Sequence, residues 1–96
     1  PRIAQADAIA GWLRTGLTPA TDLPHVRDVR VRGAIGVVQL DRPIDAARAS
    51  AACVERGVWL RPLGDVLYTT PPLVADEEEI ARIARAIVAV ASEDQI

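Results

Sequence analysis

The chain has 96 residues, of which 50% are hydrophobic and 25% charged, and its formal net charge is −2. This is the composition of one small globular domain, and its basic residues are scattered among acidic ones, so we expect no binding to nucleic acid or membranes. The single cysteine excludes an internal disulfide and a multi-cysteine zinc site, and it favours a reducing, cytoplasmic setting.

The first predicted element is a helix over residues 4–16. Ile9, Trp12 and Leu13 have the i, i+3, i+4 spacing of an apolar helix face. Gly16 follows this stripe, where a glycine commonly ends a helix.

Two β-rich stretches follow a proline-containing connector at 18–25. Between 28 and 32, valines alternate with charged residues, which predicts a strand with one solvent-facing side. Residues 34–40 form a second β-rich run. Gly33 and Gly36 interrupt this region, and they predict a bend, a bulge or a tight hairpin.

The middle of the chain predicts a helix over about 46–56, after a turn at 41–43. Asp45 is a suitable N-cap for this helix. Gly57 stands where a helix commonly stops.

A second pair of strands is predicted at 58–60 and 66–70, separated by a turn over 62–65. Two prolines at 71–72 prevent the second strand from continuing.

The last element is a helix with a capping box formed by Asp76 and Glu79. Its apolar stripe has helical spacing and comprises Ile80, Ile83, Ala84, Ile87, Val88 and Ala91. The element order α-β-β-α-β-β-α predicts an α+β domain: a small, mostly antiparallel sheet with helices on one face.

The core material is unusual, because Phe and Met are absent and only Trp12, Trp59 and Tyr68 are aromatic. A core of Ala, Val, Ile and Leu buries little area per residue, so we expect a partner surface to supply large apolar contacts. The first residue is Pro1 rather than Met. We therefore expect the chain to be a processed or truncated piece of a longer protein.

Arg61 is the residue whose context best suits ligand binding. It follows a short predicted strand, and Pro62 restricts it to extended geometry, so its guanidinium could hold a carboxylate through two hydrogen bonds. The alternative is a local ion pair, for example with Asp65. Tyr68 on the next strand could line the same pocket, although a half-buried strand tyrosine is the commoner case.

No other residues suggest a catalytic or metal site. Cys53 on an alanine-rich helix is best interpreted as a small buried residue, and His25 as a solvated loop side chain. All eleven basic side chains are Arg. Without Lys, the chain cannot form a Schiff base through a side-chain amine, and we assign it no catalytic residue.

Residues 28–43 and 57–72 resemble the C-terminal region of class III aminotransferases, and the resemblance extends from about residue 22 onward. The second stretch contains Val-Trp-Leu-Arg-Pro at 58–62, with Tyr68 seven residues after the Arg. This pattern is most similar to the branch that transfers an amino group from S-adenosylmethionine to 8-amino-7-oxononanoate, giving 7,8-diaminononanoate for biotin.

The resemblance implies a homodimeric fold-type I enzyme that uses pyridoxal phosphate, with small-molecule substrates and a large domain that carries the cofactor lysine. It implies that residues 1–96 are the C-terminal small domain, with 1–17 as a linking helix and 26–96 as the α+β domain proper. The substrate carboxylate then binds Arg61, and Leu63 and Tyr68 are candidates to line the pocket. The piece alone is expected to be inactive and to hold no cofactor covalently.

Two positions depart from the pattern of that branch. An aromatic residue usually stands where this chain has Leu63, and a Tyr often stands at Leu73. Both changes move toward the general class III pattern. The alternatives are therefore another class III aminotransferase, acting on an ω-amino acid or diamine, and a stand-alone interaction module.

Overall fold

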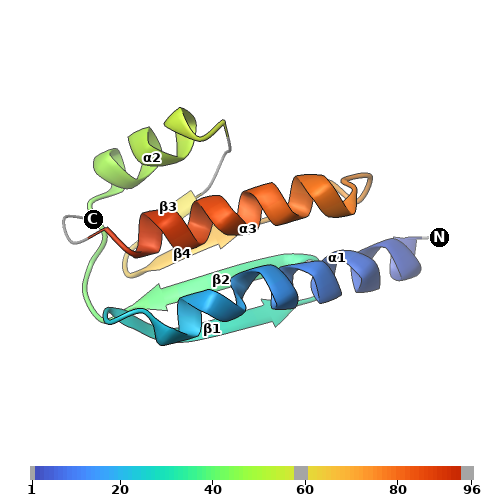
Figure 1. Ribbon diagram of the computed structural model, residues 1–96, viewed down its shortest axis with the longest axis horizontal. Helices are drawn as coiled ribbons and strands as arrows, with labels where there is room; N and C mark the ends of the chain where they lie inside the picture. Colours follow the sequence, from blue (N-terminus) through green and yellow to red (C-terminus); the bar gives the residue numbers. More distant parts are fainter. Residues whose placement is uncertain (1, 58–60, 94–96) are drawn as a thin grey trace.

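The computed structural model of the chain describes residues 2–57 and 61–93. Its elements (Figure 1) are, in chain order, α1 (Arg2–Leu17), a 3-10 helix (Thr18–Asp22), β1 (Val26–Arg32), β2 (Ile35–Leu40), α2 (Ala46–Glu55), β3 (Arg61–Leu63), β4 (Val66–Thr69) and α3 (Glu77–Ala91). The predicted α+β class and element order are confirmed.

The four strands form one antiparallel sheet in the order β1-β2-β4-β3. Helices α1 and α3 lie side by side across one face of this sheet, whereas α2 lies beside α3 and the β3 edge (Figure 1). In the part of the chain that the structure describes, no element covers the other face, which we call the open face.

The core lies between the sheet and the two long helices. Its fully buried larger side chains come from both layers: Ile9, Leu13, Leu17, Val38, Leu40, Leu67, Ile80, Ile87 and Val90. Alternation along β2 places Val38 and Leu40 in this core, so that Val37 and Gln39 belong to the open face. Small residues complete the core, as the composition predicted.

Gly16 does not end the first helix, and the prediction that it would is wrong. Helix α1 continues through Leu17 into the 3-10 helix. A Cβ atom at Gly16 would lie 2.5 Å from the Cβ of Ala84 in α3. Gly16 therefore serves the close approach of α1 to α3, a role that a local sequence pattern does not reveal.

The other helix boundaries agree with the capping signals. The Asp45 side chain accepts a hydrogen bond from the Arg48 backbone N–H, and Gly57 has a left-handed φ of 72° just after α2. At α3, Asp76 and Glu79 form the predicted capping box, with each side chain bonded to the backbone of the other.

The glycine signal between the first two strands predicted a bend, a bulge or a tight hairpin, and the structure has a tight hairpin there. Gly33, with a φ of 53°, and Ala34 connect β1 to β2, because Arg32 pairs with Ile35. A register shift between Val26 and Asp28 adds a bulge at the start of β1.

Candidate functional site

The β3–β4 hairpin carries the three predicted site residues. Its strands are joined by a two-residue turn, in which Gly64 has a φ of 62°. The predicted turn over 62–65 is therefore too long, because Pro62 and Leu63 already belong to β3. Pro62 is tolerated there because β3 is an edge strand, with one side of its backbone facing away from the sheet.

The backbone register places Arg61 opposite Tyr68, and Leu63 opposite Val66. Tyr68 is half-buried and also pairs with Val37 on β2. Leu63 is 67% exposed. The strand predicted at 58–60 lies outside the described residues, and Arg61 is described through its backbone, as the first residue of β3.

A chain of hydrogen bonds crosses the open face beside this hairpin. The Arg30 Nη1 donates to Asp28 Oδ2 at 2.7 Å and to Gln39 Oε1 at 3.0 Å. The Gln39 Nε2 in turn donates to Asp65 Oδ2 at 3.0 Å. Both ends of the Gln39 amide are thus engaged, which fixes its orientation.

The sequence suggests Asp65 as a candidate ion-pair partner for Arg61 and indicates no role for Gln39. The structure instead gives the Asp65 carboxylate an amide donor from β2. A signal was available: Gln39 is the polar residue in the otherwise apolar run Val37–Leu40, at a position of the alternation that faces away from the core.

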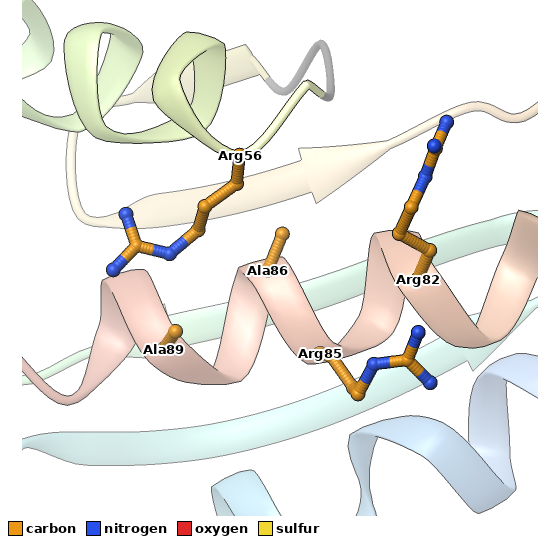
Figure 2. A pocket seen from close by; sticks show the side chains of 5 residues that line it. All are labelled: Arg56, Arg82, Arg85, Ala86 and Ala89. Atoms are coloured by element: carbon orange, nitrogen blue, oxygen red, sulfur yellow. The ribbon is translucent and has the colours of Figure 1, made fainter.

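A hollow of about 340 Å³ lies between the end of α2 and α3. It is lined by Arg56, Arg82, Arg85, Ala86 and Ala89. Figure 2 shows that the three guanidinium groups point in different directions. That of Arg56 is also engaged, because it donates to the Ala52 carbonyl at 2.9 Å and lies 3.4 Å from Glu93. The three guanidinium groups therefore do not form a common binding site for an anion.

Other titratable side chains of the domain have structural roles. Cys53 is 1% exposed, and burial raises the pKa of its thiol, so the neutral form is favoured. Glu77, Glu78 and Glu79 occupy the first turn of α3, where they suit the helix dipole. Among the described residues, no three metal-binding side chains cluster, and no helix is long and apolar enough to span a membrane.

Sequence comparison connects this hairpin and its domain with aminotransferases. The sequence model of the family described as aminotransferase class-III matches residues 2–91. The adenosylmethionine-8-amino-7-oxononanoate aminotransferase of Mycobacterium leprae is 48% identical over 83 residues, which cover 86% of this chain and 19% of that protein. The protein of the same name from Corynebacterium glutamicum is 41% identical over 83 residues, covering 86% and 20%. The chain therefore spans about a fifth of the length of these curated relatives.

Solved structures share the fold. A thermostable six-fold mutant of an omega transaminase from Pseudomonas jessenii superposes with a TM-score of 0.83 at 25% identity, covering 99% of this chain and 23% of that chain. The P. jessenii omega transaminase in complex with PMP gives a TM-score of 0.83 at 26% identity, covering 98% and 23%.

Proposed function

Because the chain belongs to the class-III aminotransferase family, we propose that it is the C-terminal small domain of a pyridoxal-phosphate aminotransferase of biotin synthesis. The observation that carries the proposal is its 48% identity to the adenosylmethionine-8-amino-7-oxononanoate aminotransferase of M. leprae. The whole enzyme would transfer an amino group from S-adenosylmethionine to 8-amino-7-oxononanoate and release 7,8-diaminononanoate. We propose that it works in the cytoplasm, a setting that the unpaired Cys53 supports.

Arg61 is proposed to bind the carboxylate of 8-amino-7-oxononanoate. The Val-Trp-Leu-Arg-Pro motif supports this role, and so does the position of Arg61 on a strand whose partner strand carries Tyr68. A guanidinium suits the task because its planar fork matches the two oxygens of a carboxylate. Leu63 and Tyr68 are proposed to line the pocket around the aliphatic chain of the substrate.

The residues of this chain do not fit covalent attachment of the cofactor, because it has eleven Arg and no Lys. Pyridoxal phosphate supplies the electron sink for transamination when a lysine amine holds it. We propose that this lysine lies in a large domain outside the 96 residues. Incubation of the chain with the cofactor, followed by borohydride, should leave no adduct on any side chain. A mapped side-chain adduct would contradict this proposal.

The open face of the sheet is proposed to pack against that large domain, in a homodimer. Ile35 and Leu63 are 44% and 67% exposed on this face, with Val37, Val66 and Tyr68 between them. About four fifths of the length of the relatives lies outside the matched region, enough to cover the face. The carboxylate-binding strand would then lie at the contact between the two domains.

A second candidate is another class III aminotransferase, acting on an ω-amino acid or a diamine. An omega-aminotransferase from Caulobacter vibrioides is 28% identical over 89 residues. Leu63 and Leu73 also depart from the biotin-branch pattern toward the general one.

The amino donor distinguishes the two candidates. The full-length enzyme should convert 8-amino-7-oxononanoate to 7,8-diaminononanoate with S-adenosylmethionine, as measured by mass spectrometry of the product. Simple diamines and ω-amino acids should be poor donors under the same conditions. Amino transfer from these donors, with none from S-adenosylmethionine, would favour the second candidate.

A further inference from the structure

The described part of the edge strand β3 is short, with three residues. Among the residues that the structure describes, it comprises Arg61–Leu63, and these residues pair with β4. Its middle residue, Pro62, has no N–H to donate. A strand of this kind needs other contacts to hold its register and position.

Helix α2 packs against β3, and further contacts come through the β3–β4 turn. The Leu40 N–H donates to the Asp65 carbonyl at 2.7 Å, and the Ile44 N–H donates to the Gly64 carbonyl at 2.7 Å. The side-chain hydrogen bond from Gln39 to Asp65 is the third connection to this two-residue turn. All three originate from the end of β2 and the segment that follows it.

The side-chain connection is ordered by its neighbours. The Asp28–Arg30 ion pair has a separation of 2.7 Å, and Arg30 holds the Gln39 oxygen, so the Gln39 nitrogen is directed at Asp65. A hydrogen bond to a carboxylate is stronger than a neutral one. The Gln39–Asp65 bond is also partly buried, which reduces competition from water.

We propose that Gln39 and Asp65 are positioning residues, forming a clamp that sets β3 in register for substrate binding. They hold the turn, the turn holds β3, and β3 carries Arg61. The inference rests on the proposed carboxylate role of Arg61. It adds that two residues outside the binding motif determine how well the enzyme recognises a carboxylate.

The test uses the full-length enzyme and compares 8-amino-7-oxononanoate with its carboxamide analogue. Gln39→Leu keeps similar bulk but removes both hydrogen-bonding groups. We expect it to reduce the preference for the carboxylate, measured as the ratio of kcat/KM values, by roughly 3- to 10-fold, as for the loss of one hydrogen bond. Asp65→Ala should behave alike. Asp65→Asn keeps an acceptor oxygen and should retain most of the preference. Gln5→Leu, the same change at an exposed position of α1, is the matched control.

Hydrogen exchange of the 61–69 peptide reports the clamp independently of catalysis. Exchange should accelerate in Gln39→Leu and Asp65→Ala, much less in Asp65→Asn, and it should stay unchanged in Gln5→Leu. Unchanged exchange in Gln39→Leu overturns the clamp. Faster exchange with an unchanged carboxylate preference overturns the positioning role. If Arg61→Ala itself leaves the preference intact, the proposed carboxylate role has failed, and the positioning role fails with it.

Discussion

On the helix-covered face of the sheet, Val38, Leu40 and Leu67 are at most 1% exposed, whereas Leu63 on the open face is 67% exposed. The open face also carries a hydrogen-bonded amide and a charged pair, at Gln39 and at Asp28 and Arg30. The covered face thus holds the fold together by apolar packing. The open face keeps polar groups and incompletely buried apolar groups, which agrees with the proposal that it meets substrate and another domain.

Two leucines of the same hairpin test this division most directly. Leu67→Ala removes a fully buried side chain and should lower the free energy of unfolding by roughly 2–5 kcal/mol. Leu63→Ala should change it by less than about 0.5 kcal/mol, since that side chain is mostly exposed. Denaturant unfolding of the 96-residue chain measures both. Equal losses would contradict the division between the faces.

Arg61→Ala should affect substrate binding rather than the stability of the fold. In the full-length enzyme it should weaken the binding of 8-amino-7-oxononanoate by roughly 2–4 kcal/mol, the value of a charge-assisted bidentate contact. Arg61→Lys should not restore binding fully, because an ammonium cannot reproduce the planar fork. Steady-state kinetics, measured together with melting temperatures, distinguish carboxylate binding by Arg61 from a local ion pair.

Arg82→Ala, at an exposed position of α3, is the control for Arg61. The cofactor spectrum should stay normal in both variants. If Arg61→Ala lowered only the melting temperature and left the specificity constants unchanged, Arg61 would be removed from the site.

Two glycines of α1 test whether the covered face depends on the close approach of α1 to α3. Gly16→Ala places a Cβ against the rigid Ala84 Cβ and should destabilise the chain by about 1–3 kcal/mol, as overpacking does. Gly11 has no neighbour within 4 Å of such a Cβ, so Gly11→Ala should stabilise it by roughly 0.5–1 kcal/mol. Thermal unfolding of the two variants compares them. Stabilisation by both would show that α1 and α3 do not need this close approach.

The capping box of α3 has a smaller expected effect than the Gly16 contact, because it is solvent-exposed. Asp76→Ala removes the acceptor for the Glu79 N–H, a bond of 2.8 Å, and should cost about 1 kcal/mol. Glu78→Ala leaves both capping bonds in place and serves as the control. Equal melting temperatures for the two variants would show that the box contributes little.

The sequence predicted those parts of the fold that depend on local chemistry. The alternation in β1, the Asp45 and Asp76 caps and the Gly57 stop have local causes, and the structure contains them. Gly16 was misjudged because its role depends on Ala84, a residue 68 positions away whose contact no local pattern shows.

The site was predictable in part, for a similar reason. The motif indicated Arg61 and the strand that follows it, and the register places Arg61 opposite Tyr68 on that strand. The extent of the turn was misjudged, because Pro62 is a turn former whose place in an edge strand depends on the sheet order. Gln39 was missed because its hydrogen bond to Asp65 spans 26 positions.

The strand order also bears on how quickly the chain folds. Strands β1 and β2, like β3 and β4, are joined by two-residue turns, so each hairpin can form within microseconds. The β2–β4 pairing joins the hairpins across α2, and α1 must meet α3 from the other end of the chain. Such distant contacts slow folding, because the chain loses the entropy of loop closure before the contacts can stabilise it. We therefore expect the rate-limiting step to be the joining of two preformed hairpins, with the α1–α3 contact at Gly16 completed afterwards.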